Sequence, residues 1–256
     1  MTHSSCPTGS ATQENAAPTP LVLLGGTLCD HALWAPMLDA DPGLRPVALP
    51  TPYADHKSAA DATRALLHQL PARFAVLGFS LGGFVALELA AQAPERIAGL
   101  ALVASNARAD TPDNAPVRRA AFGAAREAGL ARFVETTLWP QYVASHRRDD
   151  AALAATIGGM AVRVGLEAFA DQVDIALTRV DSRPRLPAIR VPALIVSGDE
   201  DVLNPEDRQH ELADGLPDAH WHVCARTGHF VPLEAPAQLG RVVREWLARI
   251  EGKRSA

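Results

Sequence analysis

Short apolar runs alternate with longer segments of mixed apolar and polar residues along most of the chain, beginning after Pro20. The apolar runs have the length of strands and are bounded by turn residues such as glycine and proline. They predict strands at 21–25, 46–49, 73–78, 97–103, 191–197 and 219–224. The mixed segments predict helices near 31–40, 57–70, 81–93, 205–214 and 236–250. Such alternation is typical of a mostly parallel central sheet flanked by helices, which is an α/β fold.

Residues 106–187 interrupt this alternation, because they contain no convincing strand and are rich in alanine. They predict helices near 115–130, 131–144, 150–159 and 163–178. An insertion that follows a parallel strand lies above the carboxyl ends of the sheet, where open α/β sheets bind ligands. We therefore expect an α/β core formed by residues 21–105 and 188–256, with residues 106–187 as a helical cap.

Composition and charge exclude several classes of protein. The chain has 48% hydrophobic and 21% charged residues and a formal net charge of -5, so general affinity for nucleic acid is not expected. No apolar run reaches the roughly 18 residues of a membrane span. Residues 1–20 lack the basic start and apolar stretch of a secretory signal, and they predict a disordered tail. The three cysteines, Cys6, Cys29 and Cys224, are too scattered for a disulfide framework, which fits a reducing cytoplasm.

The strongest chemical signal is a serine flanked by glycines where an apolar strand leads into an apolar helix. The segment Gly78-Phe79-Ser80-Leu81-Gly82 fits the pattern Gly-x-Ser-x-Gly. A tight turn of this kind exposes the serine hydroxyl, and the small glycines leave room for it. The start of the following helix presents free amides, including that of Leu81, and the positive end of its dipole. The alternative is an ordinary turn, but the strand before and the helix after favour a nucleophile.

A nucleophilic serine needs a base, and the base needs a third group to orient it. The loop after the fifth predicted strand offers Asp199, Glu200 and Asp201, and the segment after the sixth offers His229. Three other histidines fit packing or surface positions better: His210, His220 and His222. Asp199 follows the strand end directly, where an aspartate commonly bonds loop amides.

Two further motifs carry a resemblance to a known family: Gly198-x-x-Asp201-x-x-x-Pro205 and Gly228-His229-x4-Glu234-x-Pro236. Together with the serine turn, they resemble the acid and histidine loops of the capped, serine esterase-like α/β-hydrolases. The resemblance covers residues 21–250 and keeps the chain order serine, acid, histidine. It implies an α/β-hydrolase fold with an inserted helical cap, in which Ser80 is the nucleophile, His229 the general base and Asp201 the orienting acid. Glu234 is expected to anchor its loop.

Gly25-Gly26-Thr27 resembles the loop that supplies the second oxyanion donor in this family. By that resemblance the backbone N–H groups of Thr27 and Leu81 form the oxyanion hole. The family's loop usually begins His-Gly, and this chain has Gly25 at the histidine position. A plain Gly-Gly turn is the alternative. Only about 20 polar residues precede the first strand, so the two amino-terminal antiparallel strands of many relatives are not expected.

No cofactor or metal is expected. Cys29, Asp30 and His31 are adjacent in sequence and cannot easily converge on one ion, and a cysteine nucleophile would leave the Ser80 turn unexplained.

The resemblance implies a small-molecule substrate with a carboxylic ester, lactone or thioester, cleaved through an acyl-enzyme on Ser80. The same triad also serves carbon–carbon bond hydrolases, lyases and perhydrolases, and some hydrolase-like proteins are receptors without turnover. Serine at the turn argues against haloalkane dehalogenases and epoxide hydrolases, which carry aspartate there.

Apolar cap residues are candidates for the pocket lining: Leu130, Phe133, Leu138, Trp139, Met160, Val164, Leu166 and Phe169. Of these, Trp139 and Phe169 are the sites we single out, although helical spacing of such residues also fits plain core packing. Two arginine pairs have two possible interpretations. They either lie on solvated faces or hold an acidic acyl group or a carrier protein: Arg118-Arg119 and Arg147-Arg148.

Overall fold

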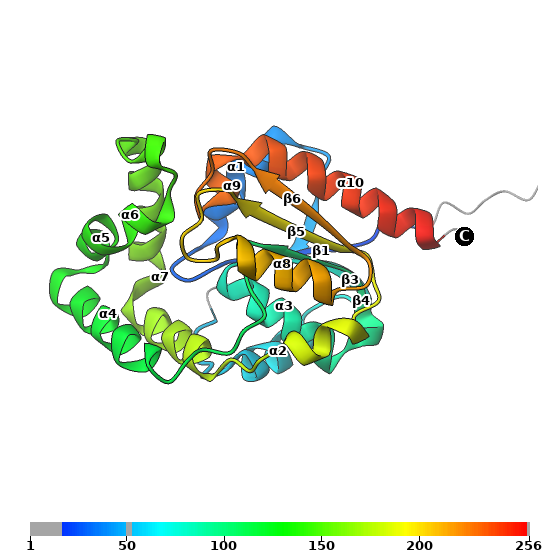
Figure 1. Ribbon diagram of the computed structural model, residues 1–256, viewed down its shortest axis with the longest axis horizontal. Helices are drawn as coiled ribbons and strands as arrows, with labels where there is room; N and C mark the ends of the chain where they lie inside the picture. The colour runs from blue at the N-terminus through cyan, green and yellow to red at the C-terminus, as the bar shows by residue number, and fades with distance from the viewer. Residues whose placement is uncertain (1–16, 50–52, 255–256) are drawn as a thin grey trace, which may run out of the picture.

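The computed structural model describes residues 17–49 and 53–254, which contain a six-stranded parallel sheet (Figure 1). Its strands are β1 (Leu21–Leu24), β2 (Pro46–Ala48), β3 (Phe74–Phe79), β4 (Ile97–Val103), β5 (Ala193–Gly198) and β6 (Ala219–Cys224). They are ordered β2-β1-β3-β4-β5-β6, and every pairing is parallel. The predicted α/β class and parallel sheet are confirmed, with strand bounds that differ from the prediction by at most two residues.

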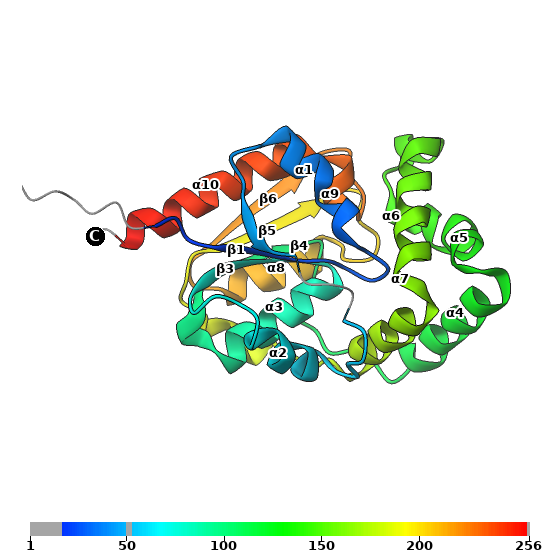
Figure 2. The same cartoon turned by 180° about the vertical axis from the view of Figure 1, so that it is seen from behind.

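Helices cover both faces of the sheet (Figure 1 and Figure 2). On one face lie α1 (Ala35–Ala40) and α10 (Pro236–Arg254), and on the other lie α2 (Ala59–Leu67), α3 (Leu81–Gln92) and α8 (Glu206–Gly215). Alternate residues of β1 feed two separate cores, because successive side chains of a strand point to opposite faces. Leu21 and Leu23 pack in one core with Met37, and Val22 and Leu24 pack in the other.

The predicted helix over 31–40 is divided in the structure. A short 3-10 helix, η1 (His31–Leu33), comes first, and α1 begins after Trp34 with Pro36 in its first turn. Proline lacks the N–H that would continue the preceding turn, so it favours a new helix start. Short helices that the sequence did not predict complete the core: η2 (Pro94–Arg96), η5 (Arg183–Ala188) and α9 (Val231–Glu234).

Between β4 and β5 the chain forms only helices and loops until it returns to the sheet. These helices are α4 (Asn114–Ala128), α5 (Leu130–Phe133), the π-helical η3 (Val134–Leu138), α6 (Trp139–Tyr142), η4 (Ser145–Arg147), α7 (Ala151–Thr178) and η5. Apart from η5, which packs against α8, they lie beyond the carboxyl ends of the strands, as the arrows of β5 and β6 show in Figure 1. Gly165 has φ 82° and breaks α7. The break lies inside the predicted helix 163–178, whereas the gap predicted at 160–162 is helical in the structure.

Helix α7 is bonded to the core on both sides of this break. Before it, Arg163 Nε donates to Asp30 Oδ2 at 2.6 Å. After it, Asp171 Oδ2 accepts a hydrogen bond from the Asp55 N–H at 2.6 Å. The two halves of the helix therefore hold the inserted region against the loops that follow β1 and β2.

Helix α7 is also long and apolar enough to cross a membrane by length and composition alone, a feature that the search for uninterrupted apolar runs did not predict. Its side chains Leu153, Ile157, Met160 and Phe169 are buried in the core that also includes residues of α4 and α5. The core helix of a folded domain meets the same criterion, and 33% of the apolar window of α7 is buried in the structure.

Residues 17–20, predicted as the end of a disordered tail, instead contact the folded core. Thr19 is buried and its N–H donates to Glu251 Oε1 at 3.2 Å, while Pro20 O accepts from the Ala75 N–H at 2.8 Å. Hydrogen bonds to β3 and α10 therefore order these residues, and such contacts between distant segments are not visible in the sequence. The rest of that prediction, over residues 1–16, lies outside the described residues.

Candidate active site

Ser80 lies in the turn between β3 and α3, with φ 51° and ψ -114°. A positive φ is unfavourable for a residue with a Cβ, so the surrounding packing must hold this conformation. A Cβ at Gly78 would lie 2.3 Å from Gly82 O, and a Cβ at Gly82 would lie 2.2 Å from Leu24 O. Both positions therefore require glycine, which is the physical reason for the Gly-x-Ser-x-Gly spacing.

Neighbouring strand β4 fixes the backbone of the same turn. The Ser80 N–H donates to Val103 O at 2.9 Å, and Ser105 Oγ donates to Ser80 O at 2.8 Å. A Cβ at Gly83 would lie 2.2 Å from Ser105 Oγ, so a third glycine makes room for this bond. The Ser80 hydroxyl is thus held at the edge of the sheet where the strands end.

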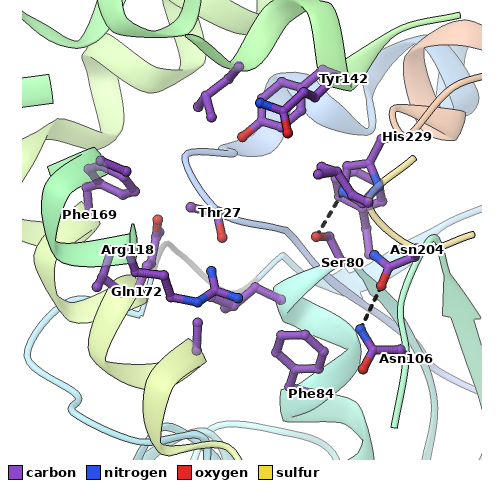
Figure 3. Close-up of a pocket in the computed structure, with 18 of the residues that line it drawn as sticks. Thr27, Ser80, Phe84, Asn106, Arg118, Tyr142, Phe169, Gln172, Asn204 and His229 are labelled. Carbon is purple, nitrogen blue, oxygen red and sulfur yellow. Dashed lines mark hydrogen bonds between the residues drawn. The ribbon is translucent and has the colours of Figure 1, made fainter. Parts of the chain in front are cut away.

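The structure joins Ser80, His229 and Asp201 in one hydrogen-bonded row. His229 Nε2 lies 3.0 Å from Ser80 Oγ, and His229 Nδ1 lies 2.9 Å from Asp201 Oδ2. Figure 3 shows the bond between Ser80 and His229 at the edge of the cavity. The side chains of His229 and Asp201 are only 4% and 0% exposed. This geometry orients an imidazole so that one nitrogen faces the serine and the other a carboxylate.

Asp201 uses both carboxylate oxygens. Its Oδ1 accepts from the N–H groups of Leu203 at 2.9 Å and Asn204 at 3.0 Å, while Oδ2 faces His229. Burial acts to raise the pKa of Asp201, but the charge and hydrogen bond of His229 and the two amides outweigh it, so the pKa is lowered. The carboxyl therefore stays ionised at neutral pH.

The two neighbouring acids point elsewhere. Asp199 Oδ1 accepts from the Thr227 N–H at 3.1 Å, the loop-amide bond that the sequence predicts for it. Glu200 Oε2 accepts from the Ser145 N–H at 2.7 Å, so it bonds the inserted helices. Of the three acids, Asp201 is the one hydrogen-bonded to His229.

Residues of the inserted region hold the loop that carries His229. The Tyr142 carbonyl accepts from the N–H of His229 at 2.9 Å. A Cβ at Gly228 would lie 2.6 Å from the Ala144 backbone N, so the two segments touch closely. Glu234 Oε2 accepts from the Ala144 N–H at 2.8 Å, and burial raises the pKa of this carboxyl. Glu234 thus bonds the segment that packs on its loop.

The loop after β1 reaches the cavity through Thr27, and Leu81 reaches it from the start of α3. Specific contacts hold this loop, although it lacks the histidine usual at position 25. Tyr53 Oη donates to Gly25 O at 3.1 Å, and the Leu28 N–H donates to Gln172 Oε1 at 2.8 Å. The loop is therefore fixed to α7.

The adjacent residues Cys29 and Asp30 have structural partners. Cys29 is buried, its Sγ donates to Thr27 O at 3.3 Å, and burial raises the pKa of the thiol well above its ordinary value. Asp30 caps η1 by accepting from the Ala32 N–H at 2.9 Å and also pairs with Arg163. A protonated, buried thiol is a poor nucleophile.

Ser80 and His229 open onto a cavity of about 240 Å³ between the sheet edge and the inserted helices (Figure 3). Of the predicted cap residues, Phe133, Leu138 and Phe169 line it. Trp139 does not, which corrects the prediction: its Nε1 donates to Arg148 O at 2.9 Å, and it faces the opposite side of the helices. The other predicted lining residues are also absent from this wall: Leu130, Met160, Val164 and Leu166.

Several lining residues were missed by sequence reasoning: Phe84, Asn106, Tyr142, Gln172, Arg179, Asn204 and Arg208. Asn106 and Asn204 follow β4 and β5 and are bonded to each other, Nδ2 to Oδ1, at 2.6 Å. The rule that ligands bind at the carboxyl ends of parallel strands points to these two positions. No comparable local signal marks the arginines.

A model of the α/β-hydrolase fold matches residues 39–236. A putative carbamate hydrolase, RutD, from Variovorax paradoxus is 30% identical, over 89% of this chain and 90% of the relative. A pimeloyl-[acyl-carrier protein] methyl ester esterase from Neisseria meningitidis is 32% identical, over 68% of each chain. The biotin biosynthesis bifunctional protein BioHC from Cellvibrio japonicus is 31% identical over 88% of this chain, which spans about half (47%) of that relative's length.

Solved structures share the fold at lower identity. A thermophilic esterase from Thermogutta terrifontis superposes with a TM-score of 0.81 at 23% identity, covering 91% of this chain and 90% of the other. The enol-lactonase from Burkholderia xenovorans gives 0.79 at 24%, covering 92% and 94%. The parallel sheet, the inserted helices and the match over most of its length show that the chain belongs to the α/β-hydrolase fold family.

Proposed function

We propose that this protein is a serine hydrolase that cleaves a carboxylic ester, with Ser80 as nucleophile, His229 as general base and Asp201 as the acid that orients it. The observation that carries the proposal is the row of bonds at 3.0 Å and 2.9 Å from Ser80 through His229 to a buried carboxylate. A hydroxyl in this arrangement loses its proton to the imidazole as it attacks.

In the acylation step, the Ser80 Oγ attacks the ester carbonyl carbon while its proton moves to His229 Nε2. The carbonyl oxygen becomes an oxyanion, and the N–H groups of Leu81 and Thr27 are the donors that we assign to it. Collapse of this intermediate breaks the bond to the alcohol, which takes the proton from Nε2. The acyl group remains on Ser80.

In the second step, water attacks the acyl carbon as His229 Nε2 removes its proton. Collapse of the second oxyanion returns that proton to Ser80 Oγ and releases the carboxylic acid. Asp201 stays ionised throughout, because its lowered pKa keeps it a carboxylate beside the imidazolium. Residues 106–187 act as a cap that closes the cavity from above, a role supported by the lining side chains Phe133 and Phe169.

The names of the relatives support an ester-like substrate. The Neisseria relative is named for a methyl ester and the Variovorax relative for a carbamate, and both bonds have an acyl carbon that a serine attacks. We place the carboxylic ester first, since esterases occur among both the sequence relatives and the solved structures.

The experiment measures hydrolysis of p-nitrophenyl acetate and p-nitrophenyl hexanoate by the wild type and by Ser80→Ala. Turnover is expected to fall by at least about 10³-fold in the variant with its fold retained. Ser145→Ala is the matched control, because this serine is exposed and outside the cavity. A fluorophosphonate should label Ser80 in the wild type and nothing in Ser80→Ala.

Other results would redirect the assignment. Stoichiometric binding of small esters without turnover would identify a receptor. Cleavage of a carbon–carbon bond or lyase activity that depends on Ser80, without ester hydrolysis, would keep the residues and change the reaction. Unchanged ester turnover in Ser80→Ala would overturn the proposal.

A further inference from the structure

The cavity beside Ser80 is lined by three arginines, and its lining among the described residues includes no aspartate or glutamate. Arg118 comes from α4, Arg179 directly follows α7, and Arg208 belongs to α8. Figure 3 shows the Arg118 side chain reaching into the cavity from the inserted helices, on the side across from Ser80. Three segments that are distant in the sequence thus bring positive charge to one enclosed space.

A buried carboxylate, that of Asp110, contacts two of these arginines. It accepts from Arg118 Nε at 2.5 Å and from Arg179 Nη2 at 3.3 Å, and its own side chain is 1% exposed. Burial acts to raise its pKa, but the hydrogen bonds of Arg118 and Asn114 and the charge of Arg179 lower it. Asp110 is therefore ionised, and two guanidinium groups, those of Arg118 and Arg179, share its negative charge.

Arg179 is the structural member of the three. Its Nε donates to Arg108 O at 2.9 Å and its Nη1 to Ala176 O at 2.7 Å, while the guanidinium lies 4.5 Å from the ring centroid of Phe84. Burial lowers the pKa of Arg179 to about 10, so it remains charged at neutral pH. It contributes charge to the cavity but has its donors engaged.

Arg118 and Arg208 each have N–H groups that donate to no acceptor among the described residues. Arg208 Nη1 donates to Leu203 O at 3.1 Å, but its Nε is buried without a hydrogen-bond partner in the described part of the chain. Arg118 uses Nε on Asp110, and its Nη groups make no hydrogen bond to any residue in 17–49 or 53–254. A buried donor without a partner is costly, and a ligand oxygen at this position would satisfy it.

We infer that the substrate is an ester that carries a second, anionic group, a carboxylate, which Arg118 and Arg208 bind while the ester carbonyl lies at Ser80. This inference rests on the proposed function, because it places the reacting bond at Ser80. Guanidinium groups bind carboxylates through charge-assisted hydrogen bonds, which are stronger than neutral ones. The apolar side chains Phe84 and Leu203 line the same cavity and suit a short methylene chain between the two groups.

The half-ester of a short dicarboxylic acid has this chemistry. Hydrolysis adds water across the ester bond, releases a neutral alcohol and one proton, and leaves a dicarboxylate. A cavity of about 240 Å³ is small for a ligand pocket, which favours a compact substrate over a long acyl chain. Arg118 thus belongs to the site, whereas Arg119 beside it is exposed and outside the cavity.

The test compares two methyl esters of equal length, monomethyl adipate and methyl hexanoate, which differ only in a terminal carboxylate. We expect kcat/KM to be at least tenfold higher for the anionic ester in the wild type. Arg118→Gln and Arg208→Gln should each remove most of that preference, measured as the ratio of kcat/KM for the two esters. Arg119→Gln, on the same helix, is the matched control and should keep the preference.

Binding keeps the inference testable apart from catalysis. The Ser80→Ala protein is titrated with both esters by calorimetry, and tighter binding of monomethyl adipate that depends on Arg118 and Arg208 supports the inference. Equal kcat/KM and equal affinity for the two esters would overturn it. Selective binding by Ser80→Ala without any turnover in the wild type would overturn the proposed function and leave the carboxylate site standing.

Discussion

Tyr142 in the inserted helices and His229 in the core are joined at two levels. The Tyr142 carbonyl accepts from the His229 N–H at 2.9 Å, and the two rings stack with centroids 6.0 Å apart. Phe79 is a second ring neighbour of His229, and the centroids of these two rings lie 5.1 Å apart. The position of the proposed base therefore depends on the inserted region as well as on the sheet.

Gly228→Ala tests this dependence. The added methyl group would lie 2.6 Å from the Ala144 backbone N, so the His229 loop must move away from the inserted helices. Displacement of a reacting group by about 1 Å costs on the order of 10²-fold in rate, and we expect kcat to fall by that order. Gly158→Ala in α7 meets no atom within 4 Å and should keep full activity with unchanged or higher thermal stability. Normal kcat in Gly228→Ala would show that the contact is not needed.

Asp201→Asn and Asp199→Asn separate the two acids. Asp201 is bonded to His229 and to two amides, so its amide replacement should lower kcat by a factor on the order of 10⁴. The Asp199 side chain bonds only the Thr227 N–H among the described residues, and its replacement should cost about 1 kcal/mol of stability with little change in kcat. Steady-state kinetics and urea unfolding of both variants check this. A larger kcat loss in Asp199→Asn would reverse the assignment.

Phe169→Ala and Trp139→Ala distinguish the cavity wall from the packing behind it. Both side chains are buried, so each truncation should lower the free energy of unfolding by about 3–5 kcal/mol. Phe169 also lines the cavity, so its loss should change the rate ratio between p-nitrophenyl acetate and hexanoate by about tenfold. Trp139→Ala should leave that ratio unchanged. A shifted ratio in Trp139→Ala alone would return that residue to the pocket.

Asp110→Asn should destabilise the fold in a pH-dependent way. The pKa of Asp110 in the folded protein lies below its unfolded value of about 3.9, so its carboxylate stabilises the fold above that pH. At pH 7 the variant leaves Arg179 buried beside an uncharged amide, and we expect a loss of about 3 kcal/mol. The loss should shrink as the pH falls through the folded pKa, because the wild type is then protonated as well.

Asp181→Asn is the control for that measurement. Asp181 pairs with Arg183 at the surface, where an ion pair contributes at most about 1 kcal/mol. Chemical denaturation of both variants between pH 3 and pH 7 gives the comparison. A constant difference for Asp110→Asn across this range would contradict an ionised carboxylate at that position.

Local backbone constraints explain what the sequence predicts well. The requirement for glycine at positions 78 and 82 comes from contacts of less than 2.5 Å that any Cβ would make, so the pattern around Ser80 is visible in the sequence itself. Fully buried strands such as β3 and β4 also give unbroken apolar runs. These features depend on few neighbouring residues, most of them close in the sequence or on the adjacent strand.

The rest depends on contacts between distant segments. Apolar spacing marks Trp139 and Phe169 as buried, but it does not show which face of the helices turns toward the sheet. Arg118 and Arg208 lie 90 positions apart in the chain, and the tertiary packing, in which α4 contacts α7, brings both to one cavity. The sequence alone leaves Arg118 open between a solvated position and a role in holding an acidic acyl group, and it does not mark Arg208.

The hydrogen bonds of α7 on either side of Gly165 affect how molecules enter and leave the cavity beside Ser80. Swinging the inserted helices away as one body would break the Arg163 to Asp30 pair and the Asp171 to Asp55 bond at the same time. We therefore expect substrates and products to pass through the mouth of the cavity while the inserted helices stay in place. Side chains such as Phe169 would change rotamer to let them through. The dimensions of that mouth, more than any large closing motion, then set which molecules enter and how fast products leave.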